Sequence, residues 1–473
     1  MTRRDTMAVQ TKMLLQRIHQ APAVAFEETI AIYRDAVAFL MEAMDASIPD
    51  LSVYDGKSIK NAMERLVNKT KDNPAPAYPD FNRRFHKFPS YLRRAAIASA
   101  FGKLRSYRSN YDNWYQARQQ AFVDGKKFHK KAPAKQFDHD DLPVFYKGNM
   151  FNRTGETTAE IKVYHQNDWV WLDISFQAQD LDKRGLLDKD GKLDWKQCNP
   201  KLIRKGKQYF LGFAYQKNIE LHDTPLASQR ICAVDMGLTN SAVCAILDAN
   251  GTVIARTFIN QAIEKDRLRQ VTGQLKQRQR QSGKIAAPRY WNRINGLQKH
   301  IKHDTARRII AFADAHQADT IVFEYLGNFR PTKGVYGAKG HRERLHYWAK
   351  VGIQNKVQEM AHYRGMRIAR INPNGTSRQA YDGSGVVTRN NKKDLATFPS
   401  GKTYQADLNA AYNIGARYFI KFLQKATPET DWLRLAAKVP SLAVRTQQTL
   451  ATLITLHTEA ASTGTAPVAS GVR

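Results

Sequence analysis

Cysteine is scarce in this sequence: its 473 residues include 3 cysteines, and no two of them form a CxxC pair. Cys198, Cys232 and Cys244 therefore predict buried thiols in a reducing compartment instead of a disulfide scaffold. Long apolar runs are also missing, since none approaches the roughly 20 residues of a membrane span. The N-terminal stretch MTRRDTMAVQTKMLLQRIHQ lacks the apolar core and cleavage site of a signal peptide. We expect a soluble intracellular protein without a membrane partner.

Acidic residues are few relative to basic ones. Lys and Arg number 74 against 43 Asp and Glu, which gives a formal net charge of +31. Such an excess indicates a polyanionic partner, with nucleic acid as the first candidate. The basic residues are densest between Lys265 and Arg308, where few acids balance them, so contact with phosphates is expected there instead of a merely solvated helix face. Four candidates for such contacts are Arg278, Arg280, Arg289 and Arg293.

The hydrophobic pattern changes twice along the chain, whose length has room for about three domains. From Phe26 to Met44 apolar residues recur at helical spacing, and a second helix is expected at 90–122. Residues 21–125 are therefore predicted to form a helical unit. Residues 130–225 contain segments of alternating apolar residues, such as Val170 to Phe176, which predict a small antiparallel barrel or sheet. A short strand at 7–16 could belong to that sheet, which would make the helical unit an insertion.

After Arg230 the pattern predicts an α/β domain. Three adjacent strands are expected at 231–237, 241–248 and 252–258, and a basic helical region follows at 261–316. The remaining predicted elements are a buried strand at 319–325, a helix at 341–364, a strand at 365–372, and a last helix that begins near 405. This order of elements is the plan of an RNase H-like domain.

Three acids fall where strand and helix ends would converge in such a domain. Asp235 lies in the first strand, Glu324 at the end of the fourth, and Asp407 in the first turn of the last helix. Isolated carboxylates are costly at buried strand ends unless a metal ion or a partner compensates their charge. Because Mg²⁺ and Mn²⁺ prefer oxygen ligands, two such ions are the expected cofactors, and they could clamp the attacking and leaving oxygens of a phosphodiester.

Each acid also has a simpler interpretation when it is taken alone. Asp407 could be a helix cap and Glu324 an edge charge. Asp235, in DMGLTN, could be a turn former or part of the phosphate loop of an actin-like kinase. No later glycine-rich nucleotide motif supports the kinase, because only the lysine-rich loop GNFRPTKGVYGAKG (327–340) follows. Taken together, the three acids favour the metal site, with Asp407 as both cap and ligand.

The motifs AVDMGLTNSAVCAILDANG, IVFEYLGN and ADLNAAYNI resemble the three RuvC motifs of transposon-encoded TnpB nucleases and of the related type V CRISPR effectors. SYLRRAAIASAFGKLRSY resembles their helical recognition domain, and NPKLIRKGKQYFLGFAY the end of their wedge barrel. The resemblance implies that Asp235, Glu324 and Asp407 are catalytic metal ligands. It also implies an RNA-guided DNA endonuclease that cuts double-stranded target DNA beside a short adjacent motif, with a guide RNA from the encoding element as partner.

The resemblance implies a fold and domain boundaries as well. We expect an α/β RNase H-like (RuvC) nuclease domain and an antiparallel β-barrel wedge domain with an inserted α-helical recognition domain. Residues 1–20 would form the first wedge strand, 21–129 the recognition domain, 130–228 the wedge barrel, 229–460 the nuclease domain, and 461–473 a disordered tail. The expected location is the bacterial cytoplasm, at the nucleoid when the protein is bound to DNA.

One segment departs from the family pattern. Relatives usually carry a four-cysteine zinc ribbon before the last motif, but residues 373–405 contain no cysteine. Ala380, Gly383 and Ser400 stand where cysteines would, so no structural zinc is expected. Three alternatives to the nuclease remain: a guided DNA-binding protein without cleavage, an RNase H-fold DNA transposase, and a structural RNA-binding protein. The sequence does not distinguish a transposon protein from a CRISPR effector.

Overall fold

The computed structural model describes residues 6–20, 22–71, 73–135, 140–237, 240–283, 287–326, 338–391, 394–439, 442 and 444–462, with 338–349 and 460–462 described by their backbone alone. The expected disordered tail lies almost wholly outside these residues. The chain divides into two compact units. We call Thr11–Lys217 the N-terminal unit, and Met1–Gln10 with Asn218–Arg473 the C-terminal unit. No helix in the described part combines the length and apolarity needed to cross a membrane.

The sheet of the N-terminal unit is built on two long strands, β1 and β7. Its strand order is β2-β3-β4-β1-β7-β5, and β6 also pairs with β7. The alternation expected within residues 130–225 is confirmed in β7, where Tyr209, Leu211, Phe213 and Tyr215 are all buried. The strands are β1 (Met7–His19), β2 (Phe151–Arg153), β3 (Thr158–His165), β4 (Asp168–Phe176), β5 (Lys196–Gln197), β6 (Lys201–Lys205) and β7 (Gln208–Glu220).

The helices of this unit all come between β1 and β2 in the chain. They are α1 (Ala23–Ser47), α2 (Ser58–Val67), α3 (Asp80–Arg84) and α4 (Ser90–Val123). The predicted apolar face of α1 is buried from Phe26 to Met44, and the helix ends before Ile48-Pro49 because proline disfavours a helical residue before it. α1 shares one hydrophobic core with α4 and with strands of the sheet, so burial of these apolar faces holds the unit together.

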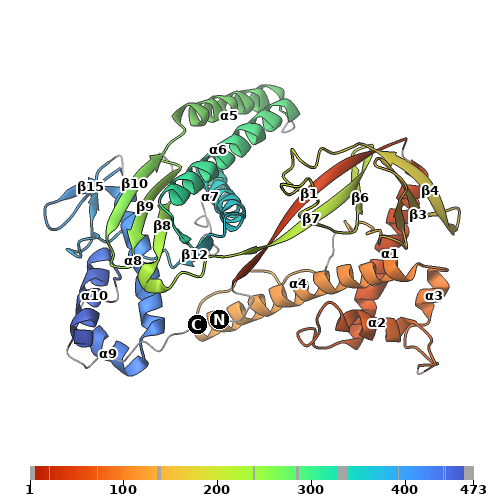
Figure 1. Ribbon diagram of the computed structural model, residues 1–473, viewed down its shortest axis with the longest axis horizontal. Helices are drawn as coiled ribbons and strands as arrows, with labels where there is room; N and C mark the ends of the chain where they lie inside the picture. Colours follow the sequence, from red (N-terminus) through yellow and green to blue (C-terminus); the bar gives the residue numbers. More distant parts are fainter. Residues whose placement is uncertain are drawn as a thin grey trace. The chain divides into compact units, whose positions relative to one another are not determined.

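The C-terminal unit contains a five-stranded sheet in the order β10-β9-β8-β11-β12 (Figure 1). β10, β9 and β8 are antiparallel, whereas β8, β11 and β12 are parallel. This is the RNase H-like arrangement predicted from the order of elements, and the α/β fold of this unit is therefore confirmed. The strands are β8 (Arg230–Asp235), β9 (Ala242–Asp248), β10 (Val253–Ile259), β11 (Thr320–Glu324) and β12 (Arg367–Ile371).

Helices cover both faces of this sheet (Figure 1). Because side chains alternate along a strand, Ala233 packs in the core with α8, whereas Cys232 and Val234 pack in the core with α6 and α7. Cys232 and Cys244 are buried, as predicted, while Cys198 is half-buried. The helices are α5 (Ala262–Ser282), α6 (Pro288–Ala315), α7 (Ala338–His362), α8 (Ala406–Ala426), α9 (Glu429–Ala437) and α10 (Gln447–Ser462), and a short 3₁₀ turn is η1 (Leu226–Ser228).

The segment before α8 forms a small sheet of its own. Its strands are β13 (Thr388–Arg389), β14 (Leu395–Thr397) and β15 (Thr403–Gln405), in the order β13-β14-β15. Ala380, at an expected cysteine position, is fully buried in a local core with Phe398. Ser400, at another, donates a hydrogen bond to Asp382 Oδ2 (2.9 Å). An apolar core and a polar contact thus occupy these two positions.

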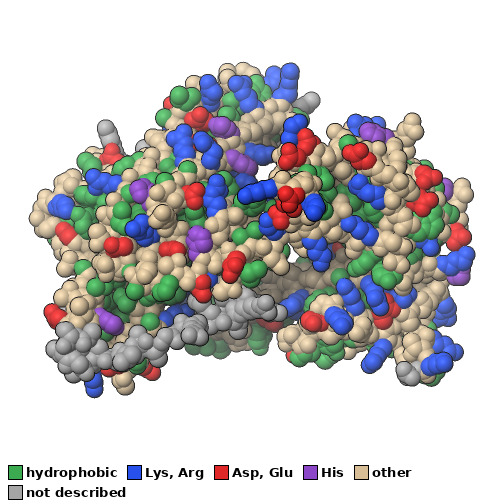
Figure 2. Space-filling view, viewed as in Figure 1, with side chains coloured by type: hydrophobic (Ala, Val, Ile, Leu, Met, Phe, Trp, Pro, Cys, Tyr) green, Lys and Arg blue, Asp and Glu red, His purple; other side chains and the backbone are tan. Residues whose placement is uncertain are grey.

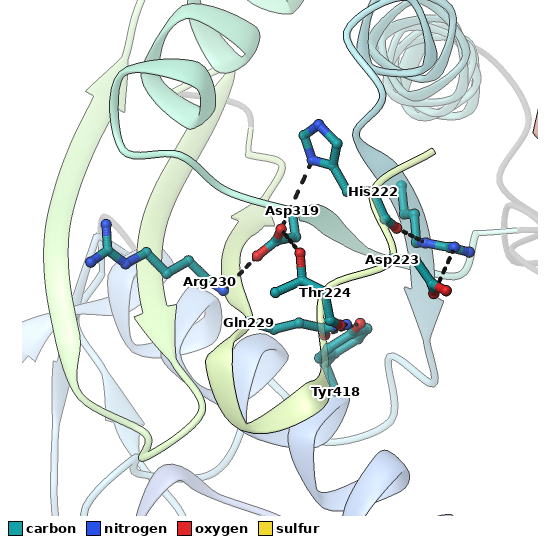
Figure 3. A network of polar contacts seen from close by, with 8 residues as sticks. His222, Asp223, Thr224, Gln229, Arg230, Asp319 and Tyr418 are labelled. Carbon is teal, nitrogen blue, oxygen red and sulfur yellow. Dashed lines mark hydrogen bonds and ion pairs between the residues drawn. The ribbon is translucent and has the colours of Figure 1, made fainter. Parts of the chain in front are cut away.

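A polar network lies at the N-terminal ends of β8 and β11 (Figure 3). The carboxylate of Asp319 accepts hydrogen bonds from the hydroxyl of Thr224 and from the backbone N–H of Arg230 (2.9 Å). Gln229 donates to the carbonyl of Thr224 (2.8 Å) and accepts from the hydroxyl of Tyr418 in α8 (2.9 Å). These contacts tie the segment that enters β8 to the sheet and to α8, at the end opposite to Asp235 and Glu324.

Candidate active site and nucleic-acid interface

Two of the predicted acids end neighbouring parallel strands. Val234 of β8 is the register partner of Phe323 of β11, so Asp235 and Glu324, the next residue of each strand, lie side by side. Each acid is the last residue of its strand, and both residues are half-buried. The backbone of Glu324 is held from α7, where Gln354 Nε2 donates to its carbonyl (3.0 Å).

The third acid reaches the same sheet end from α8. Asp407 is the second residue of this helix, and a Cβ atom added to Gly237, just beyond β8, would lie 3.2 Å from Asp407 Oδ2. The expected cap role of Asp407 is wrong: Gln405 is the N-cap, and its side chain accepts a hydrogen bond from Leu408 N (2.5 Å). The longer glutamine side chain reaches the free N–H, which leaves the Asp407 carboxylate available in the first turn, where the helix dipole favours negative charge.

The electrostatics of the site link the three acids. Burial, together with the negative charges of Glu324 and Asp407, raises the pKa of Asp235 to about 7. Lys350 of α7 opposes this effect as a nearby positive charge. The positive charge near Asp235 is thus too small to offset its burial and the two neighbouring carboxylates. A bound cation would supply the missing positive charge.

The donor set fits a hard divalent ion in its chemistry, since all three side chains offer carboxylate oxygens. Across the described residues, however, no three Asp, Glu, His or Cys side chains are already grouped at metal-binding distances. Glu324 instead has its Oε1 oxygen engaged by the hydroxyl of Thr376.

Residues that the sequence analysis did not single out support this site. Asn409 and Asn413, one turn apart and buried in α8, both donate to the carbonyl of Gln379 (2.8 Å each). Asn413 also donates to the carbonyl of Thr376 (3.0 Å), and Asn409 accepts from Tyr381 N (2.8 Å). These amides satisfy the backbone of the segment that contacts Glu324. Two asparagines at helical spacing in an otherwise apolar stretch were the available signal, since buried amides need partners.

The four candidate phosphate-contacting arginines lie on one helical pair. Arg278 and Arg280 are in α5, Arg289 and Arg293 are in α6, and all four are exposed. α5 and α6 pack through a small core that contains Val271, Leu275 and Ile294. Figure 2 shows Lys and Arg side chains over this pair. Because the apolar residues face each other, the basic residues are left on the outer surface.

The structure also sorts the arginines and aromatic residues of α4. Arg93 and Arg108 form ion pairs with Glu64 (2.8 Å) and Asp45 (2.7 Å), and Arg108 also donates to backbone carbonyls, so both support the fold. Tyr111 and Tyr115 are 38% and 48% exposed and are available to a partner. Sequence could not separate these groups because they alternate along one helix.

Comparison with known proteins gives both sequence and structural relatives. A family model described as the Aq_aa04 family matches residues 10–165. The TnpB-like protein aq_aa05 of Aquifex aeolicus (strain VF5) is 25% identical over 242 residues, which cover 45% of this chain and 75% of that protein. The resemblance to TnpB-type proteins predicted from the motifs is confirmed by this relationship.

Solved structures also resemble this chain, among them two RNA-guided CRISPR effectors. The mini-RNA-guided endonuclease CRISPR-Cas_phi3 aligns with a TM-score of 0.50 at 9% identity, covering 87% of this chain and 92% of that one. A Cas12f1 complex with single guide RNA and target DNA aligns with a TM-score of 0.47 at 15% identity, covering 83% and 81%. At these identities the likeness to CRISPR-Cas_phi3 supports a shared fold.

Proposed function

We propose that this relative of the TnpB-like proteins is an RNA-guided DNA endonuclease that hydrolyses phosphodiester bonds at Asp235, Glu324 and Asp407. The observation behind this proposal is the position of the acids: two end adjacent parallel strands, and the third comes from the first turn of α8 beside Gly237. The raised pKa of Asp235 agrees with that proximity. Acidic residues whose pKa is strongly shifted from its ordinary value are concentrated at functional sites.

We propose domain boundaries from the resemblance to TnpB-type proteins. Residues 1–20 and 130–228 would form a wedge domain, whose described part is the sheet of β1 to β7. Residues 21–129, with α1 to α4, would form the inserted recognition domain, and 229–460 the nuclease domain. The partners in this proposal are a guide RNA and double-stranded target DNA, with the protein itself recognising only a short motif beside the target.

The three carboxylates would hold two Mg²⁺ or Mn²⁺ ions. When bound, the ions supply charge stabilisation at the attacking and leaving oxygens of the phosphodiester. The contribution of the protein is to hold the ligands. β8 and β11 fix Asp235 and Glu324 in register, Gln354 fixes the end of β11, and the first turn of α8 fixes Asp407.

The exposed arginines of α5 and α6 would contact nucleic-acid phosphates. These contacts would supply affinity without sequence information, because phosphates are the same at every position. Guide–target pairing would then supply specificity. The described residues contribute a basic surface, and the sequence shows no zinc finger or basic zipper that would recognise a long site alone.

The test is cleavage of plasmids that carry matched or scrambled targets by protein with cognate RNA, unrelated RNA or no RNA. We expect Mg²⁺-dependent cutting of the matched target only when the protein carries the cognate RNA. Asp235→Ala, Glu324→Ala and Asp407→Ala should each abolish cutting and keep RNA–protein complex formation, whereas Glu429→Gln, an exposed acid in α9, should cut normally. Target-indifferent cutting without RNA would reject guidance, joined instead of cut ends would indicate a transposase, and binding without cutting would leave a guided binder.

A further inference from the structure

A basic cavity lies beside the candidate active site in the C-terminal unit. Its volume is about 460 Å³, and its lining brings together the end of β12, the segment after it, α8 and the segment before α10. The residues that line it are Arg370, Ile371, Asn372, Asn374, Arg417, Lys421 and Arg445. Four of these residues are cationic and none is acidic, so the cavity is suited to an anion.

Arg417 is the most informative residue of this lining. It is only 9% exposed, and its terminal nitrogens donate to the carbonyls of Asn372 (2.9 Å) and Val444 (3.1 Å). Its Nε has no hydrogen-bond partner among the described residues. Burial lowers the pKa of Arg417, the carboxylate of Glu324 opposes this effect, and the neighbouring charge of Arg445 acts in the same direction as burial. A buried guanidinium is costly without a counter-charge, and an anion in the cavity would supply one.

The other cationic residues of the lining add to the positive charge of the cavity. Arg370 donates to Gln358 Oε1 in α7 (2.9 Å), a neutral partner that does not cancel its charge. Lys421 and Arg445 are both exposed. Two exposed cations and one buried guanidinium thus line the same cavity.

The cavity is next to Glu324 in the sheet. Ile371, in the lining, is the register partner of Glu324 across β11 and β12. The segment from Asn372 to Asn374 continues to Thr376, whose hydroxyl contacts Glu324. Glu324 is also the carboxylate whose charge acts on Arg417. A strand bound at Glu324 would therefore pass close to the cavity.

We propose that this cavity binds a backbone phosphate of the nucleic-acid strand that enters the carboxylate site, with Arg417, Lys421 and Arg445 as positioning residues. The proposal rests on the nuclease function proposed above, and its place beside Glu324 favours the DNA strand to be cut over the guide. A phosphate anchored here would fix the register of the strand relative to the three acids, which is how positioning contributes to catalysis.

The experiment measures binding of short fluorescein-labelled single-stranded DNA to the full chain in EDTA, so that no cleavage occurs. Lys421→Gln and Arg445→Gln, singly and together, are compared with Lys425→Gln, which removes the same charge from an exposed residue one turn further along α8. We expect the double variant to weaken binding about tenfold, as for loss of charged hydrogen bonds, and to reduce the salt dependence by about 0.7 per lost phosphate contact. Lys425→Gln should leave the salt dependence nearly unchanged.

A matching RNA oligonucleotide and a cleavage assay complete the experiment. Equal effects of the cavity variants and Lys425→Gln would overturn the proposal, and weaker RNA binding with unchanged DNA binding would reassign the cavity to the guide. Arg417→Lys keeps the charge but removes the fork that holds the carbonyls of Asn372 and Val444, so it should weaken DNA binding and also lower the thermal midpoint, whereas the exposed Lys421→Gln and Arg445→Gln should weaken binding alone. Cavity-dependent binding by a protein that never cleaves would contradict the nuclease function and leave the phosphate site standing.

Discussion

The hydroxyl of Thr376 donates a hydrogen bond to Oε1 of Glu324, although 52 residues separate them in the sequence. The same hydroxyl lies 2.9 Å from the carbonyl of Pro373, and its single proton can serve one acceptor at a time. The hydroxyl that contacts Glu324 can therefore also donate to the carbonyl of Pro373. The contact to Oε1 orients the carboxylate of Glu324 and leaves its other oxygen for a metal ion.

This relationship predicts the behaviour of Thr376→Val. The substitution keeps the shape of the side chain and removes the hydroxyl that orients Glu324, and loss of such outer contacts typically costs 10- to 100-fold in metal affinity or activity. We expect the Mg²⁺ concentration for half-maximal cleavage to rise about tenfold. Thr376→Ser, which keeps the hydroxyl, should restore most of the activity; equal defects in both variants would show that packing, and not the hydrogen bond, matters.

Gly237 gives a second prediction, because it lies close to Asp407. A Cβ atom at this position would be 2.9 Å from the carbonyl oxygen of Asn240 and 3.2 Å from Asp407 Oδ2. Gly237→Ala should therefore displace the Asp407 carboxylate and reduce cleavage at least tenfold while RNA binding is kept. Gly296→Ala is the matched control: its Cβ would meet nothing within 4 Å, and in the interior of α6 it should stabilise the protein by up to about 1 kcal/mol. Normal cleavage by Gly237→Ala would contradict the proposed place of Asp407.

The pKa of Asp235, raised to about 7, predicts a pH dependence of stability in metal-free protein. The folded state binds this proton more tightly than the unfolded state, so the contribution of Asp235 to stability is lost as pH rises from about 4 to about 7. Asp235→Asn cannot titrate, and its thermal midpoint in EDTA should exceed that of wild type by a margin that grows through this range and levels off above pH 7. A margin independent of pH between 5 and 8 would show that burial and the neighbouring acids do not raise the pKa of Asp235.

The cysteine-free segment before α8 predicts indifference to zinc chelators. Ala380 is buried in the local core, and Tyr381 packs edge-on against Phe398, Tyr404 and Tyr412. We expect elemental analysis to give well below one zinc per chain, and chelators to leave the thermal midpoint unchanged. Tyr381→Ala should lower the stability by roughly 2–3 kcal/mol, because it removes the aromatic contacts that hold this sheet. One tightly held zinc per chain would contradict this interpretation.

Much of the α/β fold was predictable because it depends on local periodicity. The strands that became β8, β9, β10, β11 and β12 are apolar runs bounded by polar turns, and their order constrains the sheet to few topologies. Asp235 and Glu324 were found for the same reason, since a charge at the end of an apolar strand is visible in the sequence. The motif wording also identified the TnpB relationship.

Other features depend on contacts between residues that are far apart in the sequence or whose geometry the sequence does not specify. Gln405 rather than Asp407 caps α8, because the cap is decided by which side chain reaches the N–H of Leu408. The role of Thr376 required the fold to bring it to Glu324. The same holds for the cavity around Arg417, whose lining comes from segments between residues 370 and 445. Sequence by itself determined the elements and the acids, since both are encoded locally. Only the tertiary structure decided their partners, because burial and hydrogen bonding depend on distances in space.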